Sequence, residues 1–226
     1  MPVKPVDQIL FIAIPYVCLF TFLLMTIHRY RAQSFSYSSL SSQFLENHHH
    51  FWTTVPFHYG ILAVTVGHLI AFLIPRSILA WNSVPLRLYV LEASALACGL
   101  MTLIGLIGLM FRRATFARIR QVTSVNDWVL FTMLFVQTAS GVLIALFHPW
   151  GSSWFATNLS PYLWSIFTFQ PDLSYVTAMP HLVKLHIVLA FLTVGFFPFT
   201  RLVHLLVVPN PYLWRKTQVV RWYGQK

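Results

Sequence analysis

Four of the ten histidines in this 226-residue chain lie in stretches that are otherwise apolar. His58 and His68 are ten residues apart in one stretch, and His186 and His204 are eighteen apart in another. On an α-helix these separations correspond to about 15 Å and about 27 Å of rise, with each pair on one broad face. An ionisable side chain at membrane depth is costly and usually functional. A single histidine of this kind is as often a residue that packs between helices as a functional one. Two on each of two helices, however, indicate a set of ligands.

The histidines favour haem over an isolated metal ion. Imidazole binds iron, copper and zinc, but two imidazoles leave zinc with unfilled tetrahedral positions, and we expect no Asp, Glu or Cys at matching depth. Haem supplies four equatorial nitrogens, so two axial histidines complete its coordination and leave no open position for substrate. Gly60 and Gly67 would let a macrocycle approach the helix. The pattern therefore predicts two haems b that transfer electrons.

The two cysteines, Cys18 and Cys98, restrict the alternatives. They are too few for a disulfide framework, a structural zinc site or a cysteine-held iron–sulfur cluster, and no Cys-x-x-Cys-His motif attaches haem covalently.

Helices that cross a membrane must position these histidines, and the composition of the chain indicates such helices. Hydrophobic residues make up 57% of the chain and charged residues 9%, against about 25% charged in soluble domains. Five apolar stretches reach the length of about 20 residues that crosses a bilayer. We predict an all-α integral membrane bundle, a single domain over 1–226, with five transmembrane helices at 8–27, 54–74, 88–111, 128–147 and 182–208. Pro15 and Pro198 should kink two of them, which is tolerated only where neighbours bond the freed carbonyls.

The net charge of +10 predicts the orientation of the bundle. Most of the basic residues follow the first, third and fifth stretches, so the positive-inside rule places the N-terminus outside and the C-terminus in the cytoplasm. The charge is thus a topology signal and not a nucleic-acid-binding surface. His58 and His204 then share the cytoplasmic side, and His68 and His186 the outer side. The two histidines of one stretch are about 15 Å apart and those of the other about 27 Å apart. Helix tilt, a kink at Pro198 or ligation from different heights must account for this difference.

Two segments outside the spans have their own character. The stretch 149–180 is placed outside, and its aromatic residues favour a belt at the membrane interface over a ligand-binding lid. These residues are Trp154, Phe155, Tyr162, Trp164, Phe167 and Phe169. The tail 209–226 is aromatic and basic, and we predict that it docks cytoplasmic subunits.

The sequence resembles the gamma subunit of respiratory nitrate reductases, the dihaem cytochrome b membrane anchor. The resemblance covers nearly the whole chain and rests on these segments: SSQFLE at 41–46, FHYGILAVTVGH at 57–68, Arg112 with Arg113, LH at 185–186, FPFTRLVH at 197–204 and VPNPYLWRKTQVVR at 208–221.

The resemblance implies a quinol-dehydrogenase subunit in the inner membrane of a prokaryote. The residues matching His58 and His204 hold the cytoplasmic-side haem, and those matching His68 and His186 hold the outer haem. Quinol or menaquinol is oxidised near the outer haem. Electrons then pass to an iron–sulfur beta subunit and on to a molybdenum-containing alpha subunit that reduces nitrate. The family has a lysine at the quinol site, and the nearest basic match here is Arg87.

Other charged and titratable residues have weaker assignments. Arg112, Arg113 and Arg201 are possible contacts for haem propionates, since guanidinium pairs with carboxylate in a bidentate manner, although topology alone also explains arginines there. His148 and His181 flank the outer segment, where a capping or surface role is favoured over accepting protons from quinol.

Three alternatives remain open. The first is a gamma-like dihaem subunit of a sulfite-reduction or nitrite-oxidising complex, because nothing in the chain itself performs nitrate chemistry. The second is a transporter or proton channel that uses the histidines as a relay, although Glu92 is the one acidic candidate within the spans. The third is a structural anchor without cofactor, which would not need paired histidines.

Overall fold

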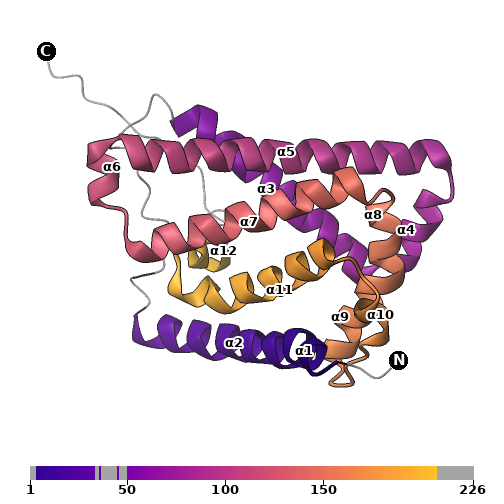
Figure 1. Ribbon diagram of the computed structural model, residues 1–226. Helices are drawn as coiled ribbons and strands as arrows, with labels where there is room; N and C mark the ends of the chain where they lie inside the picture. The colour runs from indigo at the N-terminus through magenta and orange to yellow at the C-terminus, as the bar shows by residue number, and fades with distance from the viewer. Residues whose placement is uncertain (1–3, 34–35, 37–44, 46–49, 208–226) are drawn as a thin grey trace, which may run out of the picture.

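A computed structural model describes residues 4–33, 36, 45 and 50–207, and every structural statement below concerns these residues. It confirms an all-α bundle with five helices long and apolar enough to cross a membrane (Figure 1). These helices are Pro5–Ala32, Phe51–Leu73, Pro85–Thr115, Val125–Phe147 and His181–Phe199. Most begin and end within a few residues of the predicted limits. The predicted tail 209–226 and the segment SSQFLE at 41–46, apart from Leu45, lie outside the described residues.

The first span is continuous through Pro15. It comprises α1 (Pro5–Gln8), the π-helical turn η1 (Ile9–Ala13) and α2 (Ile14–Ala32). Pro15 has no N–H to donate to the carbonyl four residues earlier, which belongs to Phe11. The hydroxyl of Tyr162, from a segment far along the chain, donates to that carbonyl at 2.8 Å. The wide turn and this bond accommodate the proline, as the prediction required.

The second and third spans cross closely at one end. They are α3 (His50–Leu73) and α5 (Pro85–Thr115), and glycines make the approach possible. A Cβ on Gly105 would lie 2.5 Å from the backbone nitrogen of Phe57, and one on Gly60 would lie 2.4 Å from the hydroxyl oxygen of Thr102. Gly60 therefore packs against α5, so its predicted role beside a macrocycle is wrong. Gly67 differs, because a Cβ there would meet nothing within 4 Å.

The fifth span is shorter than predicted. The helix α11 (His181–Phe196) packs against α2 and against α7 (Val125–Phe147), and it ends at Phe196 instead of running to residue 208. Two 3-10 turns follow, η4 (Phe197–Phe199) and η5 (Arg201–Val203), and then the short helix α12 (His204–Val207). The chain turns back beside the end of α11 (Figure 1). Pro198 thus ends the helix where the sequence predicted only a kink.

Short helices occupy the two ends of the bundle (Figure 1). One end, called here the α6 end, carries α6 (Ala117–Gln121) and α12. The opposite end, called the α9 end, carries α4 (Pro75–Asn82) and most of the stretch 149–180. That stretch forms α8 (Gly151–Trp154), η3 (Phe155–Leu159), α9 (Ser160–Phe167) and α10 (Ser174–Thr177).

The aromatic residues of this stretch divide between core and surface. Phe155 and Tyr162 are buried, whereas Trp164, Phe167 and Phe169 are exposed. Only the exposed group is therefore available for a belt at the membrane interface, and the buried group holds the stretch to the bundle.

Candidate functional site

His68 and His186 come together from different helices in the half of the bundle nearer the α9 end. His68 lies on α3 and His186 on α11, within electrostatic range of one another. The His68 Nδ1 lies 2.8 Å from the carbonyl oxygen of Val64. The ring of Phe155 meets the His68 ring nearly at right angles, with centroids 5.3 Å apart. The orientation of His68 is thus set by its own helix and by η3.

His186 is held by α7, through residues that the sequence analysis missed. The hydroxyl of Ser140 lies 2.9 Å from its Nδ1, and the side-chain amide nitrogen of Gln137 lies 3.1 Å from its Nε2. A Cβ on Gly141 would stand 3.0 Å from the ring. Their spacing of three and four residues marks one face of α7. A face of polar and small residues in an apolar helix could have indicated these residues from the sequence. It does not indicate that His186 is the residue they contact.

His58 and His204 lie toward the α6 end. The His58 Nδ1 is 2.8 Å from the carbonyl oxygen of Thr54, and the His204 Nδ1 is 2.6 Å from that of Arg201. The fold brings Phe57, next to His58, and Leu202, two residues before His204, into one apolar cluster.

The four imidazoles share one hydrogen-bonding state. A backbone carbonyl can only accept, so Nδ1 carries the proton in His58, His68 and His204. The Ser140 hydroxyl donates to the carbonyl of Gln137, so it accepts from the Nδ1 of His186. Every Nε2 is consequently unprotonated, with its orientation fixed by the other nitrogen. In His186 this Nε2 accepts from the amide of Gln137, which a metal would have to displace.

The surroundings of these histidines fit a large group better than a bare ion. In the described part of the chain, no cluster of three or more His, Cys, Asp or Glu side chains could hold a metal. The amide oxygen of Gln137, beside His186, is buried without a hydrogen-bond partner among these residues. The face of α3 at Gly67, next to His68, is open. A macrocycle that brings its own nitrogens suits this arrangement.

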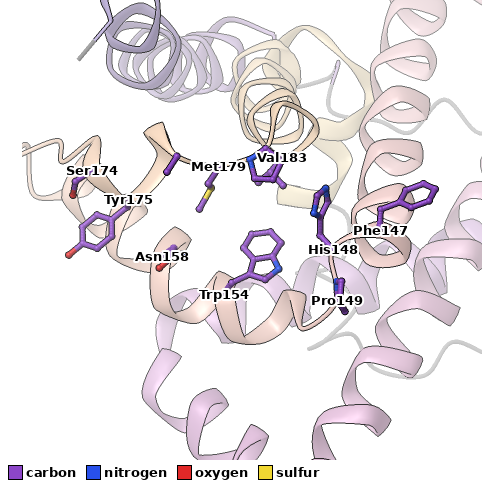
Figure 2. Close-up of a pocket in the computed structure, with 11 residues that line it drawn as sticks. Phe147, His148, Pro149, Trp154, Asn158, Ser174, Tyr175, Met179 and Val183 are labelled. Atoms are coloured by element: carbon purple, nitrogen blue, oxygen red, sulfur yellow. The ribbon is translucent and has the colours of Figure 1, made fainter. Parts of the chain in front are cut away.

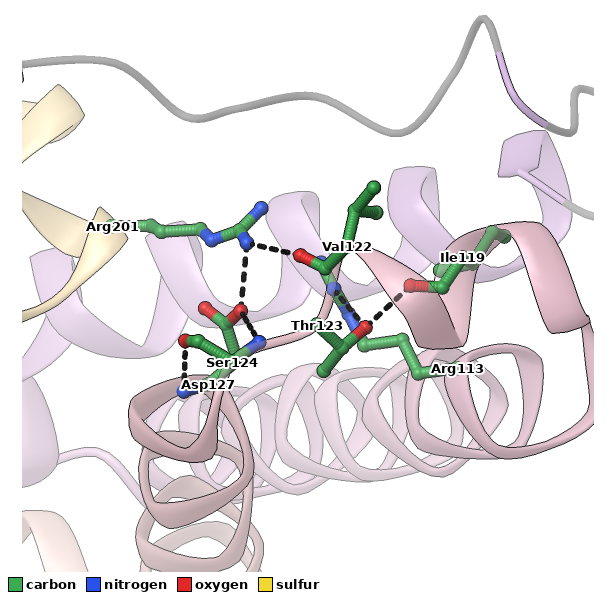
Figure 3. A network of polar contacts seen from close by, with 7 residues as sticks. All are labelled: Arg113, Ile119, Val122, Thr123, Ser124, Asp127 and Arg201. Carbon is green, nitrogen blue, oxygen red and sulfur yellow. Dashed lines mark hydrogen bonds and ion pairs between the residues drawn. The ribbon is translucent and has the colours of Figure 1, made fainter.

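The three candidate arginines lie at the α6 end, and each has a different environment. Figure 3 shows two of them, Arg113 and Arg201. Arg201 forms a 2.7 Å ion pair with Asp127. Arg113 donates to the hydroxyl of Thr123 at 3.1 Å and lies over the ring of Phe131, while its buried Nε has no partner in the described residues. Arg112 is 2% exposed. An orphaned buried donor suits a carboxylate such as a propionate.

Asp127 is a further residue that the sequence analysis missed. It caps α7 together with Ser124: the backbone nitrogen of each donates to the side chain of the other. Ser-x-x-Asp before an apolar run is a capping-box pattern and could have located the carboxylate. The pattern does not reveal that the carboxylate also binds Arg201.

At the α9 end, Arg87 lies apart from a pocket that the short helices form with α7 and α11. Its guanidinium lies over the ring of Trp81, 5.2 Å from the centroid. The pocket has a volume of about 480 Å³ and lies between the end of α7, η3, α10 and the start of α11 (Figure 2). Its lining is mostly aromatic and apolar, with His148, Asn158 and Ser174 as polar members. Arg87 does not contribute to it.

Glu92 is tied to α8 and does not form part of a relay. It accepts from the backbone nitrogen of Ser152 at 2.8 Å and also from the Ser152 hydroxyl. The amide of Asn82 donates to that same hydroxyl oxygen. The carboxylate thus joins α4, α5 and α8.

Comparison with known proteins identifies this arrangement. The family model described as nitrate reductase gamma subunit matches residues 7–223. The chain belongs to the nitrate reductase gamma subunit family. It is 32% identical to the nitrate reductase gamma chain of Bacillus subtilis over 95% of this chain and 97% of the relative. It is 34% identical to the respiratory nitrate reductase 2 gamma chain of Escherichia coli over 92% of this chain and 93% of the relative.

Membership of the gamma subunit family gives the bundle its setting. A gamma subunit is one part of a nitrate reductase, so this chain is a multi-pass membrane subunit of an oxidoreductase complex. The matched range contains all four histidines, Arg87 and most of the tail predicted to dock partners. The name of the family favours nitrate reductase over the transporter and the cofactor-free anchor.

Proposed function

We propose that this gamma subunit is a dihaem b quinol dehydrogenase, which takes electrons from quinol at the α9 end and delivers them at the α6 end. His58 and His204 would hold one haem, and His68 and His186 the other. When bound, bis-histidine haem supplies one-electron transfer without an open coordination position. The observation that carries the proposal is the shared state of the four imidazoles, each with Nδ1 engaged as a donor and Nε2 unprotonated. At His186 the haem iron would displace the Gln137 amide from Nε2.

The surrounding residues of the chain prepare this site. Backbone carbonyls orient the rings of His58, His68 and His204 before any ligand is bound. The Ser140 hydroxyl orients the ring of His186 in the same way. The orphaned Nε of Arg113 supports a propionate contact at the α6 end, and Arg112 is proposed beside it. Arg201 is proposed more weakly, because its Nη2 already donates to Asp127 and to the carbonyl of Val122.

Counting haem in the purified protein tests the proposal. We expect two haems b per chain, measured from the absorption spectrum of the extracted pigment. His68→Ala or His186→Ala should each remove one haem and spare the other, because each deletes one axial ligand of the same pair. His148→Ala, at the α9 end but outside the four, is the control and should keep both haems. A colourless wild-type protein would sink the proposal.

The quinol site is proposed at the α9 end, with Arg87 as the contact. An exposed cation stacked on Trp81 is available to an incoming polar headgroup. Arg87→Ala should then raise the KM for quinol several-fold and leave the haem content unchanged. An unchanged KM in Arg87→Ala with a raised KM in His148→Ala would instead assign the quinol to the pocket in Figure 2.

The proposed partners follow from the orientation of the bundle. We propose that the chain is a single domain in the inner membrane of a prokaryote, with the α6 end and the tail 209–226 in the cytoplasm. An iron–sulfur beta subunit would dock there and pass electrons to a molybdenum-containing alpha subunit. Identifying the subunits that purify with the full chain distinguishes this complex from a sulfite-reduction or nitrite-oxidising one.

A further inference from the structure

Polar contacts, and not regular helix, build the turn that carries His204. After α11 ends, Thr200 adopts an extended backbone with φ −115° and ψ 178°. Its hydroxyl donates to the carbonyl of Phe197 at 2.8 Å and accepts from the backbone nitrogen of Leu202 at 3.1 Å. Backbone groups freed by a helix break at membrane depth must find partners inside the protein. The partners of this turn therefore determine where His204 lies.

Arg29 supports the turn from α2. Its Nη1 donates to the carbonyl oxygen of Pro198 at 2.5 Å and to that of Thr200 at 3.0 Å. These are carbonyls that the interrupted helix cannot pair itself. A cation from the first span thus stabilises the break in the fifth.

Asp127 supports the turn from α7 (Figure 3). One oxygen, Oδ2, accepts from the Nη2 of Arg201 at 2.7 Å and from the backbone nitrogen of Ser124 at 2.9 Å. The carboxylate side chain is only 6% exposed, so water screens this pair little. Arg201 also donates to the carbonyl of Val122 at 2.9 Å. Residue 201 is therefore fixed against the start of α7.

The same residue holds the imidazole through its backbone. The carbonyl of Arg201 accepts from the Nδ1 of His204 at 2.6 Å. We propose that Asp127 is a positioning residue for His204, acting through Arg201, whose side chain binds the carboxylate and whose carbonyl orients the ring. The inference rests on the proposed function, because it takes His204 as a haem ligand.

The local charges make the carboxylate necessary. Arg113 lies within electrostatic range of Arg201, Asp127 and Arg112. Removing the negative charge would take the attraction of Asp127 away from Arg113 and leave the repulsion from Arg201 and Arg112. The turn at Arg201 would then move away from α7 and carry the carbonyl that orients His204 with it.

The experiment compares the two haems of one protein, purified as the full chain with the subunits that accompany it. In Asp127→Asn we expect a shifted midpoint potential and a shifted low-spin resonance for the haem at the α6 end, or its loss. The haem at the α9 end should keep the wild-type values. Ser124→Ala is the matched control, because it removes one capping bond to the Asp127 backbone and leaves the ion pair with Arg201 intact. Both haems should be unchanged in it.

Further variants keep the outcome decisive. If Asp127→Asn does not accumulate, the double variant Asp127→Asn with Arg201→Gln removes both charges together, and it should again alter only the haem at the α6 end. Unchanged signals from both haems, or equal changes in both, would overturn the inference. A wild-type protein without haem contradicts the proposed function itself, so the two failures are distinguishable.

Discussion

At the residue scale, the site depends on which nitrogen of each imidazole is engaged. Three histidines bond the carbonyl of a residue three or four positions earlier on their own segment, so their orientation is largely local. His186 differs, because its Nδ1 partner is the hydroxyl of Ser140 on another helix. Its geometry therefore depends on how α7 and α11 pack. This makes His186 the proposed haem ligand whose supporting residue can be replaced without changing its own helix.

Ser140→Ala should weaken the haem at the α9 end selectively. The substitution removes the acceptor for Nδ1, and losing such a supporting bond typically costs 10–100-fold in affinity for the ligated metal. The expected result is a lower occupancy or a shifted potential for that haem, measured by redox titration of the absorption spectrum. Thr193→Ala, which deletes an ordinary hydroxyl-to-carbonyl bond within α11, is the control. If the Ser140 variant titrates like this control, the hydroxyl has no role in the site.

The sequence could identify the four histidines but not their supports. An ionisable residue in an apolar stretch is visible from composition alone, and a spacing of ten or eighteen is read directly. The pairing of Ser140 with His186, or of Asp127 with Arg201, depends on the lateral packing of separate helices, which periodicity does not specify. Local patterns therefore indicate candidate ligands more readily than the residues that orient them.

At the element scale, prolines have opposite outcomes in two spans. Pro15 is absorbed, because a π-helical turn precedes it and Tyr162 bonds the freed carbonyl of Phe11. Pro198 ends α11, because no helical bond continues across Thr200. The sequence predicts a disturbance at both positions. Which outcome follows depends on the partner that tertiary structure brings to the freed carbonyl, so the predicted end at residue 208 was wrong.

Tyr162→Phe should loosen the attachment of α9 to the first span. The variant loses a fully buried hydrogen bond, and we expect the free energy of unfolding to fall by about 1 kcal/mol. Burial, with the nearby Tyr16, raises the pKa of the Tyr162 phenol above its ordinary value of 10.0. The neutral phenol is therefore favoured in the folded state, so the wild type should lose stability as the pH rises above about 10.

Detergent-induced unfolding followed over this alkaline interval measures both effects. Tyr162→Phe should show a smaller alkaline loss than the wild type, because it has no phenol to ionise. Tyr175→Phe serves as the control, since Tyr175 is exposed. Equal alkaline losses in the wild type and Tyr162→Phe would contradict the assignment.

At the scale of the whole molecule, the distribution of charge gives the bundle a direction. Arginines from separate parts of the chain gather at the α6 end: Arg29, Arg31, Arg112, Arg113, Arg118, Arg120 and Arg201. At the α9 end Lys184 is paired with Asp7 at 3.4 Å, which offsets its charge. The described arginines that follow the first and third spans thus share one end, whereas the basic residues of the tail lie outside the described residues. That this end faces the cytoplasm follows from the positive-inside rule and is a prediction.

The predicted direction can be measured with two matched glutamines. Gln121 ends α6 and Gln170 follows α9, and both are exposed. Intact cells treated with a membrane-impermeant maleimide should label Gln170→Cys and leave Gln121→Cys unlabelled until the membrane is opened. The unsubstituted chain, with Cys18 and Cys98, gives the background.

Orientation decides what the proposed chemistry achieves. Quinol oxidised at an outward-facing α9 end leaves its protons outside, while the electrons move toward the α6 end. Each electron carried across the membrane is then worth about 2.3 kcal/mol per 100 mV of membrane potential. Labelling of Gln121→Cys in intact cells would show that the α6 end faces outward. The same reaction would then release its protons into the cytoplasm and conserve no energy as membrane potential.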